Sequence, residues 1–228
     1  MNHLISVIIP VRNGANYIKK AIEGIRQQGM DLEIIVADDA STDNTCQIAQ
    51  DYGCKIVKHD TQRGQVAGKN NGLKIARGKY ILFHDHDDVM QPGALQKLYE
   101  ALEPDVMAVE AKIQDWYSPD LPFSQRAKTI IKPAPYWGSF SGAILINKEV
   151  FDHIGYFNES VYSGEIIEWK SKMDAHNFRI KKLDFVSTRR RIHATNFGKT
   201  HQRTEFHDYA TLLREKLKNR GKMGPISK

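Results

Sequence analysis

The hydrophobic residues of the chain follow two patterns that alternate along it. Short, almost continuous apolar runs are typical of strands buried on both faces, and they lie at 4–9, 33–37, 54–57 and 80–83. The segments between and after them read as helices, at 15–28, 42–52, 65–77 and 92–102. Pro10 is expected to end the first strand. Alternation of strand and helix predicts an α/β fold, with a mostly parallel, Rossmann-like sheet flanked by helices.

Acidic residues follow two of these strands. Asp38 and Asp39 come directly after the second strand, and the run DHDD at 85–88 follows the fourth. Ligands of open α/β sheets bind beyond the carboxyl ends of the strands, so both clusters should face one edge. Carboxylates this close repel one another unless a cation, protons or water offset the charge. Turn and N-cap roles are the structural alternatives, but two clusters at one edge favour a cation site.

Composition sets the class of protein. A chain of 228 residues that is 41% hydrophobic and 26% charged is long enough for one large domain with a core. It has no apolar run of membrane-spanning length and no signal-peptide layout at its N-terminus, so we expect a cytoplasmic protein. Cys46 and Cys54 are too few for a disulfide framework and lack the spacing of a zinc site.

The net charge of +6 is concentrated late in the chain. From Ser187 onward there are 11 Lys and Arg against 3 Asp and Glu. Within 201–228 an apolar stripe predicts a basic C-terminal helix and tail, formed by Phe206, Tyr209, Leu212, Leu213 and Leu217. Docking of this helix on the domain is the structural interpretation. Peripheral contact with the inner face of the membrane and homodimerisation are the alternatives. No nucleic-acid partner is expected, because acidic residues line the ligand edge.

Five segments also match, in order, the motifs of one enzyme family. They are VIIPVRN at 7–13, EIIVADDASTD at 33–43, GKNNGLKIARGKYI at 68–81, DHDD at 85–88, and GAILI with GYFNE inside 142–159. The last four are similar to the D-D-G-S-x-D, A-R-N-x-G-L, D-x-D and G-G-F-D-E elements of the family 2 nucleotide-sugar glycosyltransferases. The resemblance runs from Ser6 to roughly His193. It implies a GT-A domain over 1–200, with a nucleotide-binding half at 1–103 and an acceptor and catalytic half at 104–200.

The resemblance implies a UDP-sugar donor and a divalent cation, Mn²⁺ or Mg²⁺, that neutralises the diphosphate leaving group. Asp87 then binds the metal directly, and Asp85 serves the ribose or the water shell of the metal. Family members often supply a late histidine as a further ligand, which assigns His193 to the metal. The arginines before it could neutralise pyrophosphate, and they are Arg189, Arg190 and Arg191.

The resemblance also assigns the nucleotide pocket. Asp39 would accept the uracil N–H, and Pro10 and Arg12 would line the base. Lys69 stands where the family usually has Arg, so it could approach base or phosphate without the bidentate fork of a guanidinium.

An inverting transfer needs a base that takes the acceptor proton. The family presents an acidic pair at a helix start, but Ile166 stands where its Asp is expected. Glu165 keeps the helix-start position and is the proposed base, with Glu168 second. The residues at 115–135 could form a mobile acceptor loop. Neither the donor sugar nor the acceptor can be identified, and a metal-dependent phosphohydrolase or nuclease is the alternative function.

Overall fold

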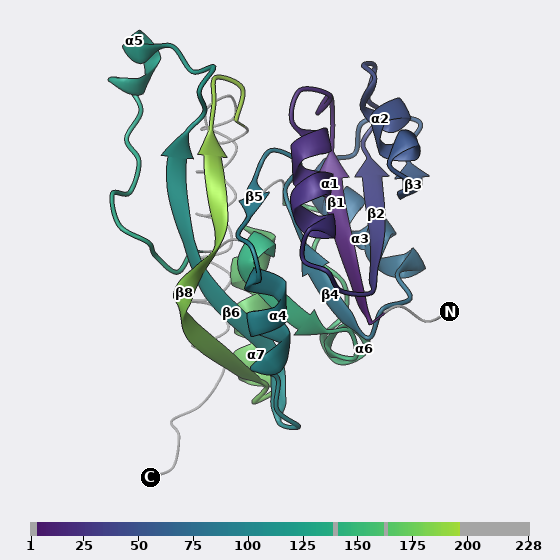
Figure 1. Ribbon diagram of the computed structural model, residues 1–228. Helices are drawn as coiled ribbons and strands as arrows, with labels where there is room; N and C mark the ends of the chain where they lie inside the picture. The colour runs from purple at the N-terminus through teal and green to yellow at the C-terminus, as the bar shows by residue number, and fades with distance from the viewer. Residues whose placement is uncertain (1–3, 139–140, 162–163, 197–228) are drawn as a thin grey trace.

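The computed structural model of the protein describes residues 4–138, 141–161 and 164–196, which form one eight-stranded sheet with helices on both faces (Figure 1). The strand order is β3-β2-β1-β4-β7-β6-β8-β5. The strands in chain order are β1 (Ile5–Val11), β2 (Leu32–Asp38), β3 (Lys55–Lys58), β4 (Tyr80–Phe83), β5 (Val89–Met90), β6 (Val106–Tyr117), β7 (Ile144–Asn147) and β8 (Arg179–Ile192).

The four strands β1 to β4 pair in parallel. Strand β1 pairs in parallel with both β2 and β4, and β2 pairs in parallel with β3. Antiparallel β7 joins β4 to β6, and long β6 pairs in parallel with β8. This mixed but mostly parallel sheet confirms the α/β class predicted from the alternating pattern.

The helices lie in two layers. One hydrophobic cluster packs α1 (Ile18–Arg26), α2 (Thr45–Asp51) and α4 (Ala94–Glu100) against one face of the sheet. A second cluster packs α3 (Gln65–Ile75), α6 (Val150–Ile154) and α7 (Glu165–Ala175) against the other. Figure 1 views the molecule from the side of α1 and α4. Strands β1, β2 and β4 are apolar on both faces because each face meets one of these clusters.

Helix α3 lies unusually close to β1. A Cβ atom added at Gly72 would stand 2.4 Å from Cγ2 of Ile8, so a side chain there would push the helix away from the sheet. The same helix carries Asn70, whose side chain donates to the Phe157 carbonyl at 2.9 Å and accepts from the Phe157 N–H at 3.1 Å. Asn70 also donates to Glu159 at 2.9 Å. The GKNNG and GYFNE segments are therefore parts of one buried contact.

Some expected boundaries are wrong. Pro10 does not end the first strand, because β1 continues to Val11 and Pro10 pairs with Ala37. Helix α1 begins at Ile18, after a turn in which the Gly14 carbonyl accepts the N–H groups of Tyr17 and Ile18. Strands β5, β6 and β7 lay outside the expected elements, and β8 runs from Arg179 to Ile192, well beyond the strand-like stretch that the sequence indicates at 180–186.

The proposed division of the domain falls in the connection between α4 and β6. The sheet is continuous across this point, and the two-half description stays a prediction. The C-terminal helix expected in 201–228 lies outside the described residues.

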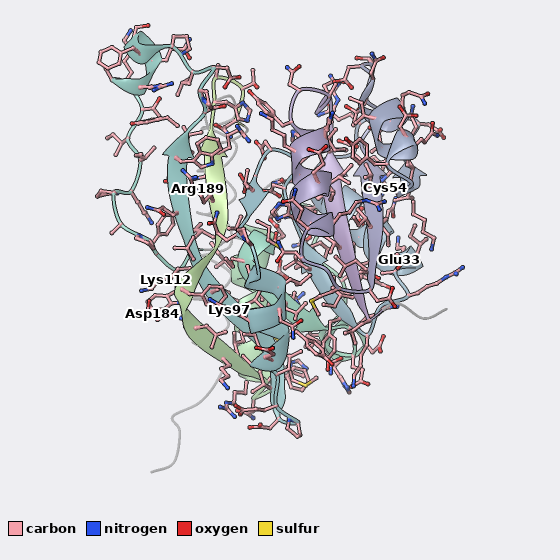
Figure 2. All side chains as sticks on the ribbon, in the orientation of Figure 1. Glu33, Cys54, Lys97, Lys112, Asp184 and Arg189 are labelled. Carbon is pink, nitrogen blue, oxygen red and sulfur yellow. The ribbon has the colours of Figure 1, made fainter. Side chains whose placement is uncertain are left out.

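The pairing of β6 with β8 is irregular and curled. Its register shifts between Ala111 and Ile113, on either side of Lys112. At this bend Lys112 forms an ion pair with Asp184, and Lys97 of α4 lies over the Phe185 ring at 5.2 Å (Figure 2). Beyond the bend, β8 also pairs with short β5 through Arg189 and Thr188. Because β5 directly follows the acidic run 85–88, this pairing brings the end of β8 beside that run.

Candidate active site

Three carboxylates gather in the loop between β4 and β5. Asp85, Asp87 and Asp88 each offer an oxygen, and these oxygens all lie within 4.8 Å of one another. Asp88 is buried, and burial together with the charges of Asp87 and Asp85 raises the pKa of Asp88 well above its usual value. Burial, more than any neighbour, also raises the pKa of Asp85. Negative charge is therefore crowded here, as in a site that binds a cation.

Asp87 and His193 meet in this loop although 106 residues separate them in the chain. Their atoms Oδ2 and Nε2 are 2.8 Å apart, and Nδ1 of the imidazole lies 3.0 Å from the Thr195 hydroxyl. Burial acts to raise the pKa of Asp87. The charge of His86 and the hydrogen bond with His193 act more strongly in the other direction, and together they lower the pKa to about 2. The two residues expected to hold the metal therefore lie in direct contact.

Arg191 fixes this arrangement. Its backbone N–H donates to the Asp88 carboxylate at 2.8 Å, and its Nε donates to the Asp87 carbonyl at 2.7 Å. Its guanidinium lies 4.4 Å from the Trp116 ring centre and 5.1 Å from that of Tyr17. These contacts hold Arg191 against the acidic loop, and the expected pyrophosphate role stays a prediction for one or more of Arg189, Arg190 and Arg191.

Asp39 follows β2 at the same edge of the sheet. Its Oδ1 lies 2.8 Å from Nδ1 of His59 and accepts the backbone N–H of Arg63 at 2.6 Å. Its Oδ2 accepts the backbone N–H of Gly64 at 2.8 Å. The other ring nitrogen of His59 lies 2.6 Å from Nδ2 of Asn71 and accepts from that amide, so Nδ1 donates to Asp39. Three of the roughly four acceptor positions of this carboxylate are used.

Pro10 and Arg12 occupy the corresponding edge of β1. Pro10 is buried and Arg12 is exposed directly after the strand. Gly68 of α3 faces Pro10, because a Cβ atom added there would lie 3.6 Å from both Pro10 and Ala37. Pro10, Arg12 and Asp39 therefore lie at adjoining strand ends, and their role in a nucleotide pocket stays a prediction.

Glu165 begins α7 and is buried against Lys69. Nζ of Lys69 lies 2.5 Å from Oε1 of Glu165 and 2.9 Å from the Ser141 hydroxyl. Burial lowers the pKa of Lys69, but the charges of Glu165 and Asp85 outweigh it and raise the value. Lys69 therefore lies between the helix-start carboxylate and the acidic loop. Glu168, by contrast, pairs with Lys172 on the same helix at 2.9 Å.

Two residues of the site, Asp88 and His59, were not assigned from the sequence, and Arg191 was assigned a different role. Asp88 belongs to the acidic run, but only the structure shows that its oxygen joins the group. His59 follows β3, and the strand-end argument used for Asp39 would have found it. Arg191 could not have been placed on the acidic loop, because that contact depends on how far β8 extends.

Residues 6–159 match the protein-family model described as "Glycosyl transferase family 2". That match covers more than half of the chain. The chain belongs to glycosyltransferase family 2. This family 2 chain is also 32% identical, over 94% of its length, to an uncharacterized glycosyltransferase of Rickettsia prowazekii, and it spans 72% of that relative. Across its first curated relatives it spans from 36% to 72% of their length.

Solved structures confirm the fold of this family 2 chain. The Staphylococcus aureus protein TarS, in complex with UDP-GlcNAc, matches 86% of the chain with a TM-score of 0.68 and 23% identity. A mannosyltransferase of Pyrobaculum calidifontis, in complex with GDP-Man and Mn²⁺, matches 88% with a TM-score of 0.68 and 18% identity. The chain covers 60% of each of these structures. Among its described residues, none of the helices has the length and apolar character needed to span a membrane.

Proposed function

We propose that this family 2 chain transfers a sugar, with inversion at the anomeric carbon, from a UDP-sugar to an acceptor, with the help of a divalent cation. The observation that carries the proposal is the contact of Asp87 with His193 inside a group of three carboxylates at the ligand edge of the sheet. The family match supports glycosyl transfer and does not favour the phosphohydrolase or nuclease alternative.

The residues present fit a cation. Asp88 has one buried carboxylate oxygen, Oδ2, with no hydrogen-bond partner among the described residues, and burial together with the neighbouring carboxylates raises its pKa. Carboxylate oxygens with an imidazole suit Mn²⁺, and carboxylates alone suit Mg²⁺. Asp87 and His193 would hold the ion, with Asp85 beside it. When bound, the ion supplies positive charge that offsets the charge of the departing diphosphate.

Asp39 favours uracil as the nucleobase. With three donors already bound, its carboxylate has room for about one more N–H. Uracil offers one N–H on its pairing edge, whereas guanine offers an N–H together with an amino group. His59 holds the carboxylate in a fixed orientation for that contact. Pro10 and Arg12 would lie along the base, as the adjoining strand ends allow.

Glu165 is the proposed general base. Its position at the start of α7 is fixed by Lys69, which occupies Oε1, while the second carboxylate oxygen can accept a proton from the acceptor. Lys69 also carries positive charge between Glu165 and the acidic loop, where it can meet the phosphates of the donor.

The experiment that tests the proposal is a donor screen. The full chain is incubated with Mn²⁺ or Mg²⁺ and with UDP-glucose, UDP-galactose, their N-acetyl forms or GDP-mannose, and release of the nucleoside diphosphate is measured. We expect metal-dependent UDP release from at least one UDP-sugar and none from GDP-mannose. Hydrolysis of nucleic acid or of simple phosphate esters, without any release from sugar nucleotides, would favour the alternative.

A further inference from the structure

The residues 118–138, here called the projecting loop, carry the most exposed large hydrophobic side chains of the described chain. Phe123 is 84% exposed and Ile130 is 98% exposed, whereas the next such side chain, Tyr156, is 47% exposed. In Figure 1 this loop follows β6 and extends beyond the sheet, with α5 (Phe123–Arg126) farthest out. Large apolar side chains gathered on one projection mark a contact surface.

Internal hydrogen bonds hold the projecting loop in shape. Arg126 donates from Nε to the Leu121 carbonyl at 2.9 Å and from Nη2 to the Pro119 carbonyl at 3.1 Å. The Tyr117 hydroxyl donates to the Thr129 carbonyl at 2.6 Å. Pairing these carbonyls inside the loop lowers the cost of moving it into a less polar environment. The loop therefore presents its apolar side chains from a preformed base.

The charge of the projecting loop is positive beyond its root. Residues 121–138 contain Arg126, Lys128 and Lys132 but no Asp or Glu. Asp120, at the root, is bound by the Tyr17 hydroxyl at 2.6 Å. Lys128 and Lys132 are both exposed. Exposed apolar side chains flanked by lysines complement an anionic lipid surface, which takes the apolar groups into its interface and the ammonium groups among its headgroups.

The root of the projecting loop adjoins the candidate site. Its Ser118 N–H donates to the Ile192 carbonyl at 2.9 Å, and its Ser118 hydroxyl oxygen accepts from Nη1 of Arg191 at 3.2 Å. Tyr17, which binds the root through Asp120, packs its ring 4.6 Å from that of His193. A surface bound by the loop would therefore lie at the same edge of the sheet as the acidic group.

We propose that the projecting loop docks this protein on an anionic membrane surface through Phe123, Ile130, Lys128 and Lys132. This docking deepens the proposed function, because it brings the transfer site to an acceptor carried at a lipid surface. Only this consequence rests on the proposed sugar transfer. The docking itself needs neither donor nor metal.

Vesicle flotation tests the proposal with the full chain. Vesicles are made of phosphatidylcholine alone or mixed with phosphatidylglycerol, at low and high salt. The wild type should float with the anionic vesicles, and the double variant Phe123→Ser/Ile130→Ser should bind them at least about tenfold more weakly. The variant Lys128→Glu/Lys132→Glu should lose the preference for anionic lipid. The matched control Ile75→Ser/Tyr156→Ser, at two other exposed apolar positions, should bind like the wild type.

Three outcomes would overturn the proposal. The wild type could fail to float with either vesicle. The Phe123→Ser/Ile130→Ser variant could bind like the wild type, which would place membrane contact elsewhere, for example in the basic residues after 196. The same variant could also bind vesicles like the wild type but sediment as a monomer where the wild type sediments as a dimer. That result would make a second copy of the chain the occupant of this surface. Thermal stabilisation of the protein by UDP in the presence of Mn²⁺, measured without vesicles, tests the proposed function separately.

Discussion

Lys69 and Glu165 show how one contact links two roles that the family resemblance assigns separately. The resemblance gives Lys69 to the nucleotide and Glu165 to the acceptor, and the structure places Nζ of Lys69 2.5 Å from Oε1 of Glu165. The sequence alone could identify both side chains as candidates, because each occupies a recognisable motif position. It could not show that they touch, since 96 residues separate them.

The choice between Glu165 and Glu168 can be tested by a matched pair of substitutions. Glu165→Gln should keep Mn²⁺ and UDP binding but lower kcat by about 10²-fold or more, because the amide cannot take the acceptor proton. Glu168→Gln should stay within a few-fold of wild type, since Glu168 pairs with Lys172 at 2.9 Å on its own helix. Steady-state kinetics with saturating donor give both values. Loss of turnover in the second variant and not the first would make Glu168 the base.

His59 provides a prediction about the nucleotide. His59→Leu removes the donor that lies 2.8 Å from the Asp39 carboxylate, so the carboxylate loses one of three contacts that orient it. We expect KM for the UDP-sugar to rise by about tenfold while kcat changes little, since hydrogen bonds to charged groups contribute about 1.5–3 kcal/mol. His153→Leu, at an exposed histidine, is the control. A fall in kcat with unchanged KM would show that His59 does not act through the nucleotide.

At the scale of elements, the strands and helices before residue 103, apart from short β5, could be predicted because their apolar runs are short, continuous and separated by glycines. The ends of these elements were predicted less accurately. Pro10, for example, lies inside β1 because the pairing of this strand with β2 continues past the proline. Strands β6 and β8 were harder to recognise because they are long, mixed in polarity and bent at Lys112. Their extent decides where His193 lies, so the metal position followed from family resemblance and not from periodicity.

Arg191 tests whether β8 holds the acidic loop in place. Arg191→Lys keeps the charge but loses the fork that reaches the Asp87 carbonyl and the Ser118 hydroxyl. We expect the free energy of unfolding in urea to fall by about 2 kcal/mol, and Mn²⁺ affinity to fall with it. Arg189→Lys is the matched control, because Arg189 also stacks on Trp116, at 4.7 Å, but is exposed. Equal losses in the two variants would assign the effect to stacking on Trp116.

At the scale of the whole molecule, the continuous sheet gathers distant segments at one edge. The ends of β1, β2 and β4 bring the residues proposed to bind the nucleotide, α7 brings Glu165, and the end of β8 brings His193. The parallel order of the first strands made this edge predictable for Asp39 and Asp85. The sequence indicated a loop at 115–135, and its acceptor role stays a prediction, but the contacts of the loop's root with Tyr17 and Arg191 could not be predicted. These contacts have no periodic signature in the sequence.

The central claim is that Asp87 and His193 hold a cation that binds the diphosphate of a UDP-sugar. The most direct measurement is the thermal unfolding temperature of the wild type and of Asp87→Ala, each with UDP alone, Mn²⁺ alone and both together. We predict that UDP stabilises the wild type only when Mn²⁺ is present and that Asp87→Ala, still folded, loses this stabilisation. Full Mn²⁺-dependent stabilisation by UDP in Asp87→Ala would contradict the account.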